Sequence, residues 1–62
     1  MTDLDLFPPD MLDPTARDRF IAHLQGLHLT PTARKKHFTD WSHAVGHRPT
    51  ARDYTRVGAD LR

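Results

Sequence analysis

The sequence predicts an all-α fold: a small three-helix bundle preceded by an extended N-terminal arm. The tetrapeptide Pro-Thr-Ala-Arg occurs three times, at 14–17, 31–34 and 49–52, and apolar residues recur every three or four positions after each copy. Proline is favoured at the first helical position, where its missing N–H breaks no hydrogen bond. No segment alternates apolar and polar residues as a half-buried strand would. The 62 residues allow one domain, with an arm at 1–13 and a helical part at 14–62.

The arm is acidic and carries large apolar side chains. It contains four Asp and no basic residue, whereas the rest of the chain carries all nine Lys and Arg and four Asp. Pro8 and Pro9 exclude a helix that continues through them. Leu4, Leu6 and Phe7 could therefore insert into a groove on a partner protein while the acids steer toward a basic rim. Alternatively, the same side chains cover the open side of the bundle, and the sequence leaves both roles open.

The three repeats mark three helix starts, and we predict helices near 14–26, 31–45 and 50–61. Gly26 and Gly46 stand where the first two helices should end, because glycine is the residue most often found just after a helix. The connections between these helices are short, which suits neighbouring helices that run antiparallel or cross steeply.

Polar side chains at the three starts can cap the helices. Asp13 and Thr30 precede the first two prolines, where a side-chain oxygen can accept a hydrogen bond from a first-turn N–H group. Arg48 precedes the third proline and cannot serve in this way. Thr50 is the better cap there, and Asp53 completes a Thr-x-x-Asp capping box.

The apolar positions predict a single core, with Trp41 as its anchor rather than as a ligand platform. Met11 or Leu12 could close one end of it. The predicted core residues are Phe20, Ile21, Leu24, Leu27, Leu29, Phe38, Trp41, Val45, Tyr54, Val57 and Leu61.

A row of arginines supports a second hypothesis, DNA binding. Arg52 and Arg56 lie one helical turn apart and roughly opposite Tyr54, and Arg48 extends the row into the preceding loop. A helix, a turn and a final helix with outward arginines is the general form of a helix-turn-helix protein, although Asp53 interrupts the patch. The residues assigned to this surface are Arg34, Lys35, Arg48, Arg52 and Arg56.

Catalysis and metal binding are not expected. The chain has no Cys and no Glu, no Gly-rich phosphate loop and no Ser/His/Asp arrangement at a strand–helix turn. A bundle of this size should also lack a pocket of several hundred cubic ångströms, so we expect no enzyme and no cofactor. Asp40, His43 and His47 have the spacing of one helix face, but Gly46 should end the helix before His47, and we expect no metal site.

Two stretches resemble known families. Residues 3–7 read Asp-Leu-Asp-Leu-Phe and resemble the Gln-Leu-(Ser/Asp)-Leu-Phe peptide by which bacterial replication and repair proteins bind the DNA sliding clamp. Asp3 replaces the glutamine of that motif. This resemblance implies a bacterial protein that docks on another protein through Leu4, Leu6 and Phe7.

The second resemblance covers residues 29–57. Residues 29–41 read Leu-Thr-Pro-Thr-Ala-Arg-Lys-Lys-His-Phe-Thr-Asp-Trp, and residues 48–52 read Arg-Pro-Thr-Ala-Arg. They are similar to the C-terminal helical region of the YdeI/OmpD-associated (bacteriocin-protection) family, which has a Pro, a basic pair, an aromatic residue three before Trp, and a later Pro with Thr-Arg. The family's larger N-terminal domain is absent here. The resemblance implies a helical fold more than a function.

These observations lead to one main hypothesis and one alternative. The main hypothesis is a non-enzymatic interaction or regulatory module whose partner is another protein, bound through Leu4, Leu6 and Phe7 or through an exposed face of the bundle. The alternative is a small DNA-binding protein. No apolar run approaches the ~20 residues of a membrane span, and the acidic start is unlike a secretory signal, so we expect a cytoplasmic protein that does not bind membranes. Self-association is left open.

Overall fold

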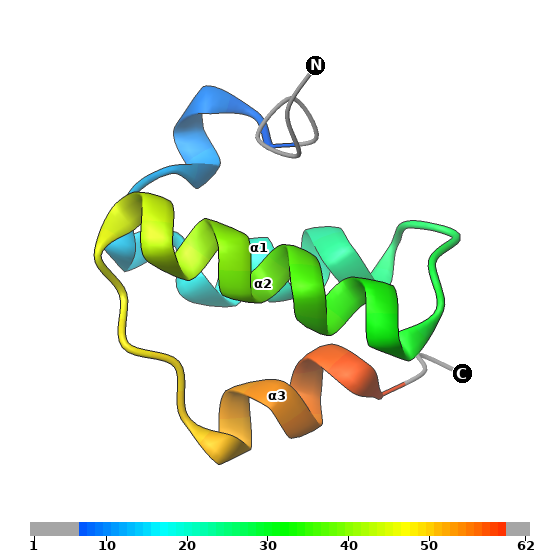
Figure 1. The fold of residues 1–62 in the computed structure, drawn as a ribbon. Coiled ribbons are helices and arrows are strands. Elements are labelled where there is room, and N and C mark those ends of the chain that lie inside the picture. The colour runs from blue at the N-terminus through cyan, green and yellow to red at the C-terminus, as the bar shows by residue number, and fades with distance from the viewer. Residues whose placement is uncertain (1–6, 60–62) are drawn as a thin grey trace.

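The structure is a computed structural model that describes residues 7–59. Two single turns of 3-10 helix, η2 (Pro9–Met11) and η3 (Pro14–Ala16), precede three α-helices. The α-helices are α1 (Arg17–Gln25), α2 (Pro31–Val45) and α3 (Ala51–Gly58) (Figure 1). No strand occurs within residues 7–59, and the predicted all-α three-helix fold is confirmed.

The helices form a bundle in which every helix contacts the other two. In Figure 1, α1 and α3 run in the same sense across the view, and α2 runs back in the opposite sense. The segment that contains η2 lies on the side of the bundle away from α3. The bundle therefore leaves the outer side of α3 uncovered by the other described elements.

The helix ends follow the capping residues read from the sequence. The Asp13 carboxylate accepts a hydrogen bond from the Thr15 N–H at 2.9 Å, and the Thr30 hydroxyl accepts one from the Ala33 N–H at 3.2 Å. Helix α2 ends at Gly46, which has a left-handed backbone with φ of 76°. This conformation favours glycine, and it lets the His47 N–H donate to the Ser42 carbonyl at 2.9 Å.

Two predicted boundaries change. The first helix opens with the 3-10 turn η3, and its α-helical part begins only at Arg17. The third helix ends at Gly58, because Ala59 has an extended backbone with φ −75° and ψ 142°. The predicted extension beyond Gly58 is therefore wrong at Ala59, and the predicted core residue Leu61 lies outside the described residues. Glycine's low helix propensity is consistent with an end at Gly58.

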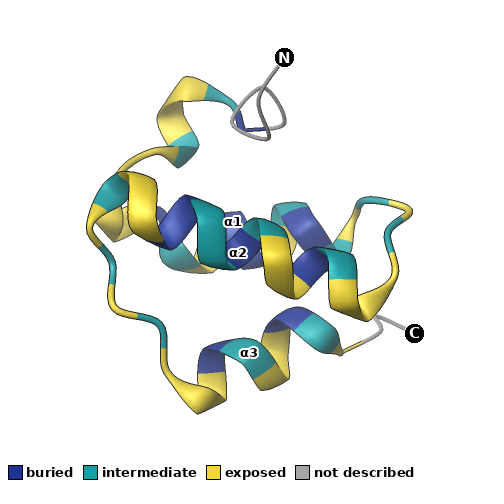
Figure 2. Ribbon diagram, in the orientation of Figure 1, coloured by how far each residue is buried: buried dark blue, intermediate teal, exposed yellow. Residues whose placement is uncertain are grey.

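An aromatic stack occupies the centre of the bundle. The Trp41 ring lies parallel to the Phe20 ring, with centroids 4.6 Å apart and an interplanar angle of 14°, and Phe38 lies 5.5 Å from Trp41. Figure 2 shows buried positions on the sides of the helices that face one another. Six predicted core residues are buried: Phe20, Ile21, Leu24, Phe38, Trp41 and Val57. Partly buried side chains pack against them: Met11, Leu27, Val45 and Tyr54.

The exposure of Leu29 and Leu12 decides two further predictions about the core. Leu29 is only half-buried and does not join the core. Leu12 is 39% exposed, so of the two candidates for the end of the core, Met11 fills the position.

The described part of the N-terminal arm folds onto the bundle. Phe7 is 5% exposed, and its ring meets the Phe20 ring edge-on at 4.8 Å. The Trp41 indole N–H donates to the Met11 carbonyl, and a guanidinium N–H of Arg19 donates to the Asp10 carbonyl at 3.4 Å. The backbone is extended at Pro8 and turns at η2. Of the two roles open to Phe7, it covers the bundle here.

Replacing Phe7 with alanine should lower the free energy of unfolding by about 3 kcal/mol, because it removes a buried ring and leaves a cavity beside Phe20. The measurement is urea unfolding followed by helicity at 222 nm. The exposed Leu12 provides the control, since Leu12→Ala should stay within about 0.5 kcal/mol of the wild type. Equal stability of Phe7→Ala and the wild type would show that the arm is not part of the core.

Candidate nucleic-acid interface

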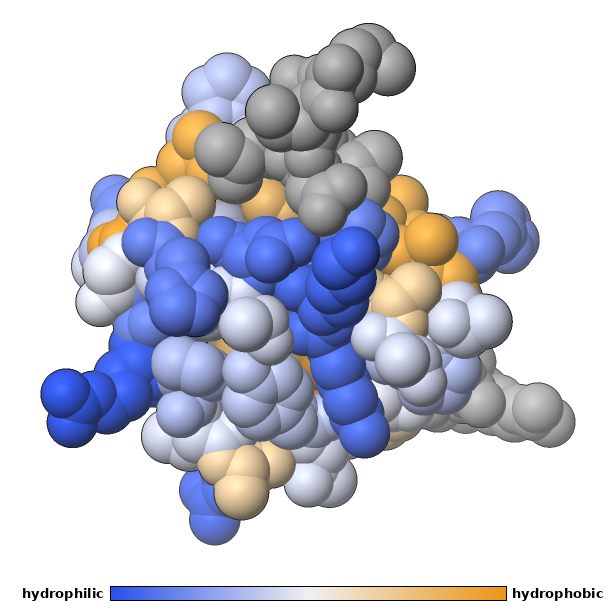
Figure 3. Space-filling model, in the orientation of Figure 1, coloured by the Kyte–Doolittle hydropathy of each residue, from blue (hydrophilic) through white to orange (hydrophobic). Residues whose placement is uncertain are grey.

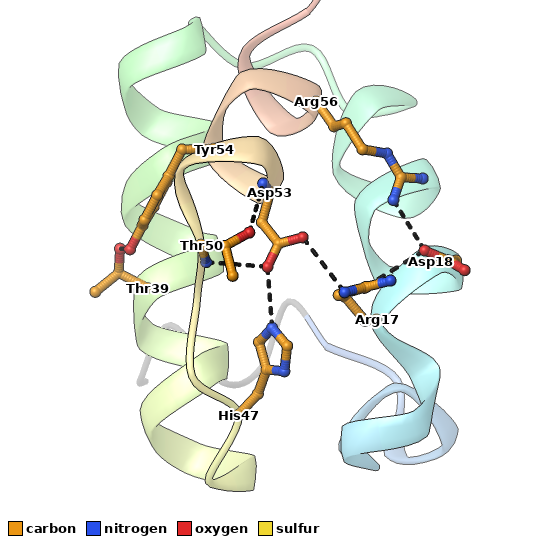
Figure 4. A network of polar contacts seen from close by, with 8 residues as sticks. All are labelled: Arg17, Asp18, Thr39, His47, Thr50, Asp53, Tyr54 and Arg56. Atoms are coloured by element: carbon orange, nitrogen blue, oxygen red, sulfur yellow. Dashed lines mark hydrogen bonds and ion pairs between the residues drawn. The ribbon is translucent and has the colours of Figure 1, made fainter.

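Helix α3 begins with the capping box that the sequence predicts. The Thr50 hydroxyl accepts a hydrogen bond from the Asp53 N–H at 3.2 Å, and the Asp53 carboxylate accepts one from the Thr50 N–H at 3.1 Å (Figure 4). These two bonds satisfy backbone donors that a helix start leaves unpaired. They set the direction in which α3 leaves the loop at 46–50.

The Asp53 side chain also joins α3 to two other segments. It is 2% exposed, and the Nε2 atom of His47 lies 3.2 Å from its Oδ2 atom. A guanidinium nitrogen of Arg17, on α1, lies 3.6 Å from its Oδ1 atom. Figure 4 shows the carboxylate between the loop and α1, with His47 and Arg17 pointing toward it. One buried carboxylate therefore ties the start of α3 to the loop and to α1.

The environment of Asp53 keeps it ionised. Burial raises the pKa of this carboxyl. Hydrogen bonds from the Thr50 N–H and from His47, together with the charge of Arg17, lower the pKa by more than burial raises it, so the net pKa is below the usual value. The sequence identified Asp53 as a capping residue but not as a buried one. Its position beside Tyr54 and Val57 on a short helix is the only signal that could have indicated burial.

A second polar contact joins α3 to α1 at the surface. A guanidinium N–H of Arg56 donates to the Asp18 carboxylate at 2.9 Å, and this bond lowers the pKa of Asp18. The Nε atom of Arg17 lies 3.5 Å from the same carboxylate oxygen. An exposed ion pair of this kind contributes little stability. Its main consequence is that the charge of Arg56 is partly neutralised.

Arg34 does not belong to the basic surface. It is 3% exposed, and its guanidinium donates to the Gly58 carbonyl at the end of α3, at 3.4 Å. Its position on α2 precedes Phe38 and Trp41 by four and seven residues, which places all three on the inner side of the helix. The assignment of Arg34 to a nucleic-acid contact is therefore corrected: this side chain holds α2 to α3.

The other predicted basic residues are exposed along α3. Arg48 and Arg52 flank the start of α3. Lys35 belongs to α2, but its side chain lies against the other end of α3: a Cβ atom added to Gly58 would come within 2.8 Å of the Lys35 Cε atom. Lys36 is exposed on the next position of α2. None of these four cations forms an ion pair within residues 7–59. Figure 3 shows strongly hydrophilic side chains over α2 on the face formed by α2 and α3, and paler, less hydrophilic ones over much of α3.

The remaining predicted site residues are not assembled into a site. Leu4 and Leu6 lie outside the described residues, and Phe7 is buried. His47 follows the end of α2 and contacts Asp53, away from a helix face shared with Asp40 and His43. Residues 7–59 contain no group of three His, Cys, Asp or Glu placed to hold a metal ion.

Comparisons with known proteins identify no relative of this chain. No family model matches the chain, and neither the curated proteins nor the solved structures contain a significant match. The two resemblances read from residues 3–7 and 29–57 therefore stay predictions. Among the described helices, none is long and apolar enough to cross a membrane.

The stability of the protein should fall as the pH drops below about 4. The folded-state pKa values of Asp13, Asp18 and Asp53 are lowered, so each contributes stability above the unfolded value of about 3.9 and loses it as the carboxyl is protonated on acidification. Thermal unfolding between pH 7 and pH 2 measures this dependence.

Asp53→Asn should be less stable than the wild type at pH 7 by about 1–2 kcal/mol and should lose less stability on acidification. The asparagine keeps the shape of the cap but lacks the charge that holds Arg17 and His47. Asp10→Asn, at an exposed carboxyl, is the matched control and should follow the wild-type curve. An acid response in Asp53→Asn identical to that of the wild type would contradict the role assigned to Asp53.

Proposed function

We propose that this protein is a non-enzymatic module that binds nucleic acid through the outer side of α3 and the loop before it. The observation that carries the proposal is the charge of residues 46–59. This segment contains three arginines and one acid, Asp53, and that acid is buried and already paired. Arg56 is paired with Asp18, so the unpaired charges that this segment presents to a partner are those of Arg48 and Arg52, and both are positive, which favours a polyanion.

The shape of α3 suits a groove. It is an eight-residue α-helix, and an α-helix with its side chains is about 10–12 Å in diameter, which a DNA major groove about 12 Å wide admits. Arg52, Thr55 and Arg56 are exposed, and the neighbouring Ala51 and Ala59 are small enough to let the backbone approach. Guanidinium groups bind phosphate oxygens through two parallel hydrogen bonds, so the arginines would supply phosphate contacts that position the helix.

Docking on another protein through the arm is the less favoured function. It requires Phe7 to leave its place against Phe20 and enter a partner's groove. Leu12 is the only large hydrophobic side chain exposed within residues 7–59, so the described surface offers no apolar patch as a substitute. The docking hypothesis thus depends on residues that the structure either buries or does not describe.

Arg52→Ala should weaken binding to a short fluorescent DNA duplex and lower the steepness of its salt dependence. Each phosphate contact contributes about −0.9 to the slope of log K against log salt, so contacts from the two unpaired arginines, Arg48 and Arg52, predict a slope near −2, and losing Arg52 should reduce its magnitude by about 1. Fluorescence anisotropy over a salt series starting near 50 mM measures both quantities.

Arg19→Ala is the matched control, because it removes the same charge from α1, outside the proposed surface. It should bind as the wild type does. Failure of the wild type to retain the duplex at low salt would overturn the proposal, and so would equal losses in Arg19→Ala and Arg52→Ala.

A further inference from the structure

The large aromatic rings of the chain are all held in the bundle. The sequence has three Phe, one Trp and one Tyr, and all five lie within residues 7–59. Four of them are at most 5% exposed: Phe7, Phe20, Phe38 and Trp41. Tyr54 is half-buried, with its ring nearly perpendicular to that of Phe38 and its hydroxyl oxygen 2.7 Å from that of Thr39. Proteins that bind single strands stack successive bases on exposed aromatic rings, and this protein uses its rings for the core.

Several side chains that could read base edges are bonded inside the protein. Adenine is read mainly by the amides of Asn and Gln, and guanine by Arg or Lys. The sequence has no Asn and one Gln, and the Gln25 amide donates to the Arg56 carbonyl at 2.6 Å. On α3, the Thr55 hydroxyl donates to the Ala51 carbonyl at 3.0 Å. The Arg56 guanidinium donates to Asp18, so all three groups already have partners within the fold.

Arg52 is the charged side chain of α3 that stays available to a ligand. It is exposed and forms no ion pair within residues 7–59. Its exposed neighbours Ala51 and Ala59 have no hydrogen-bonding group in their side chains. One guanidinium can pair with a single guanine, whereas phosphates occur at every base step of a duplex. This surface therefore suits contacts with the backbone, which carry no sequence information directly.

We propose that the ligand of α3 is double-stranded DNA, bound with little dependence on its base sequence. This inference rests on the proposed nucleic-acid function and adds the class of ligand to it. Arg48 and Arg52 would bind phosphate oxygens beside the major groove, and the small side chains of Ala51 and Ala59 would let α3 approach without selecting among the bases. An RNA duplex fits less well, because the major groove of the A form is deep and narrow.

The test measures binding of the full chain to four fluorescent ligands of equal length, by anisotropy at one low salt concentration. The ligands are an AT-rich DNA duplex, a GC-rich DNA duplex, a DNA single strand and an RNA duplex. We expect the two DNA duplexes to bind within about threefold of each other, whereas a protein that reads bases loses about tenfold or more for each wrong base pair. The single strand should bind about tenfold more weakly than the duplexes, because no aromatic ring is available to stack its bases. The RNA duplex should also bind more weakly.

Arg52→Ala separates backbone contact from base readout. It should weaken binding of both DNA duplexes by the same factor, because phosphates are present in both. Its melting temperature should match that of the wild type, since Arg52 is exposed and unpaired within residues 7–59. Arg19→Ala should bind both duplexes as the wild type does. A loss confined to the GC-rich duplex would show that Arg52 reads guanine and would overturn the inference.

The four ligands also separate this inference from the function on which it rests. Binding of the single strand or of the RNA duplex as tightly as the DNA duplexes would overturn the inference and leave the nucleic-acid function in place. A difference of about tenfold or more between the two DNA duplexes would do the same. Failure of all four ligands to bind would overturn the proposed function, and the inference with it.

Discussion

The buried carboxylate of Asp53 is the contact on which the functional surface depends. Its charge is stable inside the protein only because the loop, α1 and the start of α3 each supply a partner. Removing Arg17 or His47 would leave the buried carboxylate with fewer partners and would destabilise the fold. The ionised carboxylate therefore favours the arrangement in which the loop, α1 and the start of α3 are in contact. The same loop carries Arg48, one of the exposed arginines of the proposed nucleic-acid surface. The position of the proposed nucleic-acid surface therefore follows from one side chain.

The aromatic core imposes a second constraint, which limits what the N-terminal arm can do. A chain of 62 residues buries only about 60% of the surface it exposes when unfolded, so each large side chain matters to its stability. Phe7 joins the Phe20–Trp41 stack, and the Trp41 indole holds the Met11 carbonyl. A partner that captured Phe7 would uncover this stack. Docking through the arm and stability of the free bundle thus compete for the same ring.

Local rules predicted the framework and missed the buried polar contacts. Helical periodicity gave the three helices and the six buried core residues, and cap chemistry identified Asp13, Thr30 and Thr50, because these features depend on neighbours within a few residues. Arg34 shares its helix face with the core, but charge is a strong indicator of exposure, so the sequence favoured the wrong surface. The burial of Asp53 arises where the loop, α1 and α3 meet, and its position beside Tyr54 and Val57 is the only local signal of it. The sequence also predicted no pocket of several hundred cubic ångströms, and the hollow of about 320 Å³ between the end of α2 and the following loop shows that this was wrong, because the loop's packing is not a local property.

The ion pair between Arg56 and Asp18 determines how the charge along α3 can act. A phosphate that approaches Arg56 must replace a carboxylate already bonded at 2.9 Å, so one acceptor is exchanged for another and the net gain is small. Arg48 and Arg52 make no such pair within residues 7–59, and a polyanion gains their full attraction. The start of α3 should therefore contribute more affinity than its middle. Arg56 contributes instead by holding α3 against α1, which keeps the two unpaired arginines at a fixed spacing.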